Sequence, residues 1–222
     1  MYSAEFEIHE EGSMKYKIVF SNYSEALIKS IVHSRLIPDI SVYNDYRTIT
    51  FSATSVQTYT EFRDQQLLDR NGVKQLNYEQ TMGLVSSLAS QLKYLIETHN
   101  SCFYLFDADN LIVIDDNKFL YMSNDHMATF TSDGKVMLIQ PFGKKIPKTF
   151  VSPELTRIIC IPSKVDYRSI YYSLGSLAMH GLIGDNFENK DAVLGALKGT
   201  KLYAMLQRCL AEDPCERSIL FI

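Results

Sequence analysis

Residues 104–123, YLFDADNLIVIDDNKFLYMS, decide how the rest of the chain is interpreted. The segment holds Asn110, a run of branched apolar residues, the turn-forming sequence Asp-Asp-Asn-Lys and a second apolar run. Two such runs on either side of a polar turn predict an antiparallel hairpin. We therefore expect a loop that carries Asn110 and leads directly into a hairpin.

The residues before this hairpin change in character near residue 57. The first part alternates like strands around one amphipathic stretch, which Ser24 caps and Pro38 is expected to end. From residue 59 to residue 100 the apolar spacing is helical, and Asn77 with Gln80 forms a capping-box pattern. The strands expected in the first part cover residues 4–9, 14–20, 40–43 and 47–53. We expect a small β-β-α-β-β lobe over 1–56 and a mainly helical lobe over 57–222.

The residues after the hairpin repeat this mixture of strands and helices. Residues 127–142 contain a Ser-Asp-Gly-Lys turn between two strand-like arms, which predicts a second hairpin. Helical patterns follow at about 167–182, 191–197 and 200–211. The predicted fold class is α+β, with two lobes.

Composition narrows the possible functions. The 222-residue chain has a formal net charge of -4, which argues against nucleic acid as its main partner, since phosphate binding needs clustered Lys and Arg. The one basic cluster is Lys144, Lys145 and Lys148. The start of the sequence lacks the pattern of a secretory signal, and no apolar run is long enough to span a bilayer. Four cysteines and five histidines lack metal-site spacing, so we expect a cytoplasmic protein without a metal site, a disulfide framework or a membrane partner.

Three motifs in the second half resemble the catalytic lobe of a protein kinase. FVSPEL is similar to the Ala-Pro-Glu motif that closes the kinase activation segment. SIYYSLGSLAMHGL resembles the buried kinase helix that begins Asp-x-x-Ser-Leu-Gly, and LQRCLAEDPCERS resembles the family's Asp-Pro ending with a later Arg. The residues that carry these motifs are Ser152, Pro153 and Glu154, then Leu174 and Gly175, then Asp213, Pro214 and Arg217.

The resemblance implies roles for the opening segment. In the kinase motif H-R-D-L-x-x-x-N, the Asp is the catalytic base and the Asn holds magnesium. If Asn110 is that Asn, the base position holds Leu105, which we expect to be buried. The usual spacing to the magnesium-binding Asp of D-F-G reaches Ser123, with Asp125 two residues further on. Neither leucine nor serine can supply the missing carboxylate.

The small lobe also departs from the family pattern. The turn HEEGSM has one glycine where the resemblance implies a Gly-rich loop. Lys17 resembles the strand lysine of V-A-I-K and Glu25 its helix partner, although both also fit an exposed strand lysine and a helix-start glutamate. Ile170 replaces the helix Asp that normally braces the catalytic loop, which predicts that apolar packing replaces the polar support.

The sequence therefore predicts a degenerate kinase-like fold, a pseudokinase, that binds or scaffolds a protein without a cofactor. The expected partner is a kinase, a kinase substrate or another signalling protein. The plausible surfaces are the small-lobe helix, residues 127–142 with the basic cluster, and the tyrosines Tyr167, Tyr171 and Tyr172, although these tyrosines fit core and groove lining better than a partner site. So short a form is similar to kinase-like proteins of large DNA viruses and intracellular parasites.

Two alternatives remain open at the level of sequence. In the first, the chain is an atypical kinase or nucleotidyl transferase that needs ATP and magnesium. It would use Lys17 and Asn110 together with one of three carboxylates, Asp107, Asp109 and Asp125. In the second, the chain binds a nucleotide without transferring phosphate, through Lys17 and residues 55–57.

Overall fold

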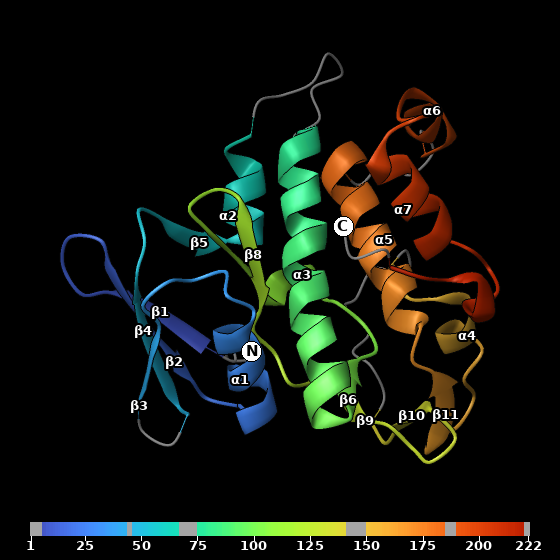
Figure 1. Cartoon of the computed structure of the whole chain (residues 1–222), viewed down its shortest axis with the longest axis horizontal. Coiled ribbons are helices and arrows are strands. Elements are labelled where there is room, and N and C mark those ends of the chain that lie inside the picture. The colour runs from blue at the N-terminus through green and yellow to red at the C-terminus, as the bar shows by residue number, and fades with distance from the viewer. Residues whose placement is uncertain (1–5, 44–45, 67–74, 141–149, 185–189, 220–222) are drawn as a thin grey trace.

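The computed structural model describes residues 6–43, 46–66, 75–140, 150–184 and 190–219 as an α+β protein (Figure 1). The first part is a four-stranded antiparallel sheet of order β1-β2-β4-β3. Its strands are β1 (Phe6–Glu10), β2 (Lys15–Phe20), β3 (Ser41–Tyr43) and β4 (Thr48–Ser52), with α1 (Glu25–His33) between β2 and β3. The predicted β-β-α-β-β order is confirmed.

Helix α1 begins where the sequence predicts but ends earlier. The Ser24 hydroxyl accepts the Leu27 N–H at 3.1 Å, as expected of an N-cap. The helix stops at His33, and Arg35 takes the left-handed φ of 58°. The prediction that Pro38 ends this helix is wrong, because the chain has already turned at Arg35.

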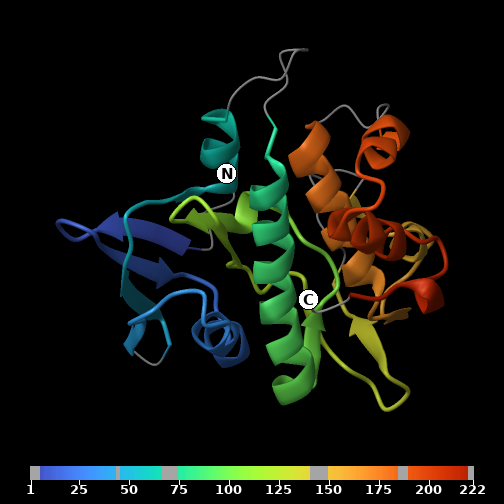
Figure 2. The same cartoon turned by 45° about the horizontal axis from the view of Figure 1, so that its top comes forward.

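The middle of the molecule is built on one long helix. Strand β5 (Val56–Thr58) leads into α2 (Tyr59–Asp64), and α3 (Tyr78–His99) then runs between the small sheet and the later helices (Figure 2). The capping box of Asn77 and Gln80 is present at its start. A Cβ added at Gly83 would lie 2.6 Å from the Asn117 carbonyl oxygen, so this glycine lets α3 cross close to the neighbouring hairpin.

That neighbour is the predicted hairpin. Strands β7 (Leu111–Ile114) and β8 (Lys118–Tyr121) pair antiparallel after the short 3₁₀ turn η1 (Ala108–Asn110). Strand β5 pairs with the other edge of β7, giving a three-stranded sheet of order β5-β7-β8. The side chains of β7 are all buried, which explains its unbroken apolar sequence.

The second predicted hairpin is not formed as expected. Phe130, the residue after β9 (Met127–Thr129), forms a single antiparallel bridge with Val136 of β10 (Lys135–Leu138). Strand β9 pairs with β6 (Ser101–Phe103), and β10 pairs with β11 (Ser163–Asp166). The turn forms as predicted, but each of the two strands pairs along its length with a strand that is distant in sequence.

The last part is helical. It contains α4 (Pro153–Thr156), α5 (Ser169–Ile183), α6 (Lys190–Ala196), α7 (Lys201–Cys209) and the 3₁₀ turn η4 (Pro214–Glu216). Leu174 on α5 is fully buried, and a Cβ added at Gly175 would lie 2.8 Å from the Cys209 Cβ on α7. One continuous apolar core joins the small sheet to these helices. Among the described residues, no helix has both the length and the apolar character that crossing a membrane requires.

Candidate functional site

The loop before β7 places a leucine in the interior. The Leu105 side chain is fully buried, as the sequence predicted, between the buried aromatic residues Phe103 and Phe106 along the chain. The rings of Phe103 and Phe106 both pack edge-on against Tyr121. Leu105 is therefore a core residue with no group that can accept a proton.

Two serines on α5 hold this loop. The Ser173 hydroxyl accepts the Phe106 N–H at 2.8 Å, and the Ser169 hydroxyl donates to the Tyr104 carbonyl at 3.2 Å. Both serines are fully buried, as is Ile170 beside them. The prediction that apolar packing replaces the polar support is wrong. Residues 169 and 173 are four apart and share one face of a helix, but this spacing alone does not show what the two hydroxyl groups bind.

Asn110 and the carboxylates near it take part in a local turn. The Asp107 carboxylate accepts the Asp109 N–H at 3.1 Å and the Asn110 side-chain amide at 3.4 Å. The Asn110 carbonyl accepts the Met122 N–H at 3.0 Å. Burial, together with the charges of Asp109 and Asp125, raises the pKa of Asp107 above its ordinary value. These contacts account for Asp107 and Asn110 as residues that shape the loop.

The segment after β8 carries Ser123 into the interior. Its side chain is fully buried, and its hydroxyl accepts the Asp125 N–H at 3.0 Å. Asp125 is exposed, and its backbone carbonyl accepts the Tyr104 hydroxyl at 3.1 Å. Within the described ranges, no group of three or more His, Cys, Asp or Glu side chains has the arrangement of a metal site.

The same segment is joined to α1. Ser24, the N-cap of α1, also donates its hydroxyl to the Asn124 side-chain oxygen at 2.8 Å. The Asn22 side-chain amide donates to the Asp125 carboxylate at 3.4 Å. These two contacts span about a hundred residues of sequence, and sequence reasoning missed them. They fix the start of α1 against residues 123–125.

A buried histidine follows this junction. His126 is 5% exposed, and the Tyr121 hydroxyl lies 2.9 Å from its Nδ1. Burial lowers the pKa of His126 to about 4, although the nearby Asp125 carboxylate acts in the opposite direction. The imidazole is therefore neutral near pH 7 and shares a hydrogen bond with the Tyr121 hydroxyl.

The turn of the opening segment holds the connection from the small sheet to β5. The Asp115 carboxylate accepts the Thr54 N–H at 2.7 Å and the Thr54 hydroxyl at 2.8 Å, and Lys118 lies 2.7 Å from it. Burial opposes ionisation, but the hydrogen bonds from Lys118 and Thr54 outweigh it and lower the pKa of Asp115 to about 2. The Ser55 carbonyl accepts the Asp115 N–H at 3.1 Å. Residues 54–57 are thus held by the hairpin turn.

Lys17 and Glu25 do not meet. Lys17 lies 3.4 Å from Glu11, and Glu25 lies 2.5 Å from Lys29 on its own helix. Along β2, Lys17 alternates with the fully buried Ile18, so it lies on the opposite face of the sheet from the core. Of the two possibilities for these residues, the contacts agree with a strand lysine and a helix-start glutamate, and the kinase-like pairing of Lys17 with Glu25 does not form.

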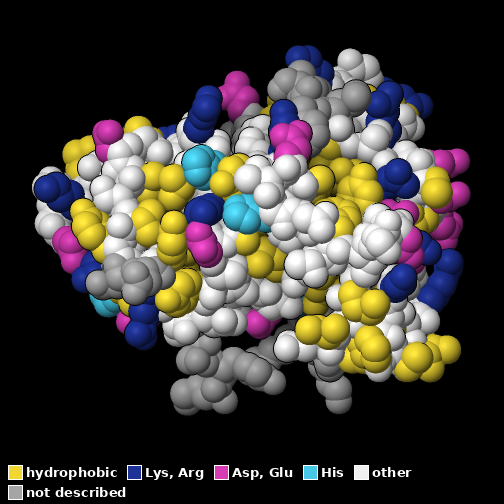
Figure 3. Space-filling model, turned by 60° about the horizontal axis from the view of Figure 1, so that its bottom comes forward, with side chains coloured by type: hydrophobic (Ala, Val, Ile, Leu, Met, Phe, Trp, Pro, Cys, Tyr) yellow, Lys and Arg dark blue, Asp and Glu magenta, His cyan; other side chains and the backbone are white. Residues whose placement is uncertain are grey.

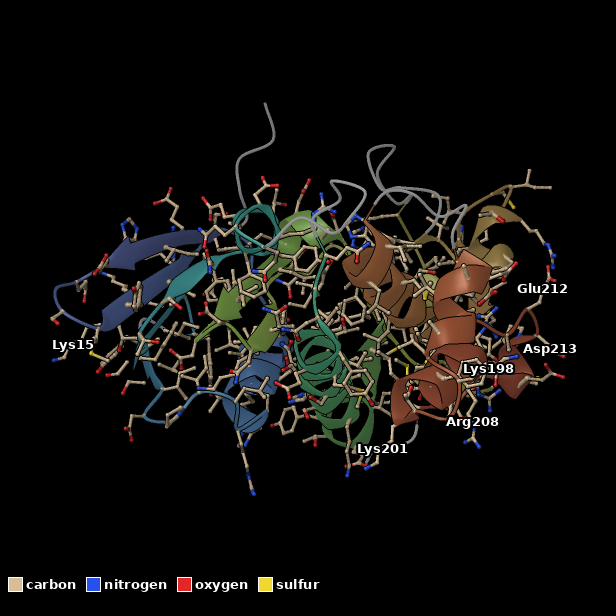
Figure 4. All side chains as sticks on the ribbon, turned by 90° about the horizontal axis from the view of Figure 1, so that it is seen from above. Lys15, Lys198, Lys201, Arg208, Glu212 and Asp213 are labelled. Carbon is tan, nitrogen blue, oxygen red and sulfur yellow. The ribbon has the colours of Figure 1, made fainter. Side chains whose placement is uncertain are left out.

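The outer face of the sheet forms a polar hollow of about 600 Å³. Its lining includes Lys15, which points outward at the end of the sheet (Figure 4), together with Lys17, Thr50 and Ser52. Glu11 and Asp39 also line it, so two lysines are balanced by two carboxylates. This balance gives the hollow no preference for a phosphate group.

The motifs predicted near the end of the chain do come together. Arg217, which is 2% exposed, forms a two-pronged ion pair with Glu154, at 2.5 Å and 3.0 Å. Its guanidinium also donates to the Ala211 and Glu212 carbonyls, at 2.7 Å and 2.8 Å, and lies 5.1 Å from the centre of the Tyr172 ring. These acceptors offset the free-energy cost of removing the Arg217 charge from water.

The flanking motif residues have structural roles. Pro153 is the first residue of α4, and Ser152 precedes it with a buried hydroxyl that makes no capping bond. Pro214 opens η4, where the Asp213 carboxylate accepts the Cys215 N–H at 2.8 Å. The predicted basic cluster of Lys144, Lys145 and Lys148 lies outside the described residues.

Of the predicted tyrosines, Tyr171 is buried and Tyr167 is partly exposed. Tyr171 is 9% exposed, and its ring packs edge-on against Tyr167, which in turn packs against Phe130. Tyr167 is only half-buried. These ring contacts join α5 to the residues that follow β9 and β11.

A scan of the sequence against protein-family models finds no match, and a search of curated proteins finds no relative.

Proposed function

We propose that the chain is a two-lobed protein kinase-like protein that does not transfer phosphate and acts by binding a protein partner. The observation that carries this proposal is the buried ion pair between Glu154 and Arg217. The two residues come from separate kinase-like motifs, 63 positions apart. A chance resemblance of two short motifs gives no reason for a direct contact between them, whereas a shared kinase-like scaffold does.

The order of the elements supports the same scaffold. A small sheet with one helix precedes a long helix, a loop with a hairpin, a short helix at Pro153 and a buried helix that contains Gly175. This is the order that the resemblance implies. In kinases the lysine lies on the third strand, whereas Lys17 lies on β2, the second strand of the described residues.

The proposed lack of phosphoryl transfer follows from three positions. A kinase needs a carboxylate base, a carboxylate on magnesium and a lysine on the phosphates. The corresponding residues here are the buried Leu105, the buried Ser123 and Lys17 on the outer face of the sheet. Three losses in one mechanism remove the base, the metal and the phosphate contact together.

The proposed action is therefore recognition of a protein, with a kinase, a kinase substrate or another signalling protein as the partner class. The packing of α1 against α3 and the hydrogen bond of Ser24 to Asn124 support this, because together they hold α1 against the helical lobe. A fixed arrangement presents a constant surface, which favours binding over a catalytic cycle of opening and closing.

A phosphoryl-transfer assay tests the proposal. The chain is incubated with radiolabelled ATP, magnesium or manganese, and generic protein substrates, beside an active kinase. We expect no incorporation above the level of heat-denatured chain. Incorporation that disappears in both Asp107→Asn and Asp125→Asn would overturn the proposal and establish a rebuilt metal site.

A further inference from the structure

We propose that two copies of this chain associate through the free edge of β11, in an antiparallel pairing that has Val165 opposite Val165 of the second copy. The inference goes beyond the function proposed above and does not depend on it. It rests on an open strand edge, an exposed apolar group beside that edge and a charge pattern that complements itself.

The first observation is the open edge. Strand β11 pairs with β10 on one side, and no other strand of the described chain pairs with it. An exposed edge carries unpaired N–H and C=O groups that can template a further strand. Strand β11 is short and carries Lys164 and Asp166, so a further strand can pair with it only where the partner's charges match these two.

The second observation is a group of exposed apolar residues at one end of this strand pair. Ile159 is 98% exposed, Ile139 is 73% exposed and Ile161 is 39% exposed. The pairing of Leu138 with Ser163 brings Ile139 next to the segment that contains Ile161. Figure 3 shows hydrophobic side chains gathered on the surface of the half of the molecule that carries β10 and β11. Apolar groups so fully in water are typical of a contact surface.

The third observation selects a second copy as the occupant. Lys164 and Asp166 lie on the same face of β11, on either side of the buried Val165. When Val165 faces Val165 of the second copy, each Lys164 lies opposite Asp166 of the other copy. Shifting the register by two residues in either direction puts two lysines or two aspartates opposite each other, which is unfavourable. One register is thus favoured by charge, and it satisfies both copies equally, as a two-fold interface requires.

Both charges also have partners within the chain. Lys164 lies 3.0 Å from Asp133, whereas one Asp166 oxygen accepts the Arg168 N–H at 2.9 Å and the other lies 3.5 Å from the Arg168 guanidinium, so Asp166 keeps these contacts while its charge faces the second copy. The side chains of the first pair are each nearly half exposed, so the pair stabilises the folded chain little. In the antiparallel arrangement, the apolar residues before β11 lie beside the residues that follow β11 in the second copy, beginning with Tyr167.

The test is the mass of the full chain in solution, measured by light scattering over a wide range of concentrations. We expect a concentration-dependent rise from the 25.4 kDa monomer toward twice that mass. Lys164→Glu and Asp166→Lys should each give a monomer, because each places like charges opposite each other. Ile159→Glu should also give a monomer. Lys201→Glu on α7 (Figure 4) and Met14→Glu on the small lobe are the controls, which should associate like the unaltered chain.

Mixing the two charge variants decides the register. A Lys164→Glu chain and an Asp166→Lys chain place Glu opposite Lys at one contact and Asp opposite Lys at the other. They should therefore associate with each other, although each alone is monomeric. A change of contacts within one chain cannot produce this result. The proposal is overturned by an unaltered chain that stays monomeric, by single variants that associate normally, or by a mixture that remains monomeric. Circular dichroism and melting temperature show that each variant is folded.

Discussion

At the scale of single residues, Leu105 and Ser123 are fully buried, and the hydroxyl groups of Ser169 and Ser173 make the hydrogen bonds that hold the loop at residues 104–106. The burial of Leu105 could be predicted from its apolar surroundings in the sequence. The serine brace could not, because hydroxyl groups on a helix are usually solvated or bonded to their own helix.

Replacing Leu105 with Asp should destabilise the protein by several kcal/mol without creating activity. The change puts a carboxylate in the core with no cation to pair with it. Leu105→Met is the matched control and should cost less than about 1.5 kcal/mol, since it conserves volume. Melting temperature and urea unfolding measure both effects. An unchanged melting temperature for Leu105→Asp would show that this side chain is exposed.

Removing one partner of the ion pair between Glu154 and Arg217 should also be costly. Arg217→Met leaves Glu154 without its cation in a mostly buried position, and we expect a loss of about 3–5 kcal/mol. Arg157→Ala is the control, because its pair with Glu212 is exposed and 3.9 Å long, and it should cost about 0–1 kcal/mol. Urea unfolding compares the two. Equal costs would mean that the buried pair does not hold α4 to the end of the chain.

His126 should make stability depend on pH. The unfolded chain binds a proton at this side chain near pH 6.5, whereas the folded protein does so only near pH 4. Between these values the unfolded state binds more protons, so the free energy of unfolding should fall as pH falls from about 6.5 to about 4. The largest loss from this group is about 3 kcal/mol. Unfolding in urea at several pH values should show a shallower slope for His126→Gln, and identical slopes would contradict the assignment.

At the scale of elements, periodicity and capping signals located the regular structure well. The small sheet, the long helix with its capping box and the hairpin after Asn110 all form where the sequence predicts. The partners of β9 and β10 could not be predicted, because a turn signal is local while strand pairing depends on distant segments. Likewise, the contacts of Ser24 with Asn124 join residues that no local pattern relates.

Two glycines on neighbouring helices should respond oppositely to the same change. Gly175→Ala adds a Cβ 2.8 Å from Cys209 at the contact of α5 and α7, and we expect a cost of about 1–3 kcal/mol from overpacking. Gly195→Ala on α6 adds a Cβ with nothing within 4 Å, and should stabilise the protein by about 0.4–1 kcal/mol through a less flexible unfolded chain. Urea midpoints for the two variants give the comparison. A neutral Gly175→Ala would show that α5 and α7 can move apart freely.

At the scale of the whole molecule, the proposed fold and the proposed lack of phosphoryl transfer rest on different residues. The fold is supported by the contact of Glu154 with Arg217 and by the order of the elements. The proposed lack of phosphoryl transfer is supported by the burial of Leu105 and Ser123, and by Lys17 on the outer face of the sheet. The burial of Leu105 was expected from the sequence, whereas the role of Lys17 was left open, because a short strand pattern alone does not show which face of the sheet packs on the core.

The melting temperature of the full chain with saturating ATP, with and without magnesium or manganese, tests the central claim most directly. A ligand at one hundred times its dissociation constant adds about 2.7 kcal/mol to the free energy of unfolding, which raises the melting temperature of a chain this long by about 5–10 °C. We predict no shift in any of these conditions, because the proposed alignment places Ser123 where a magnesium-binding carboxylate is needed, and Lys17 lies on the outer face of the sheet. A rise that requires the metal would contradict the account and would mean that the loop carboxylates form a working nucleotide site.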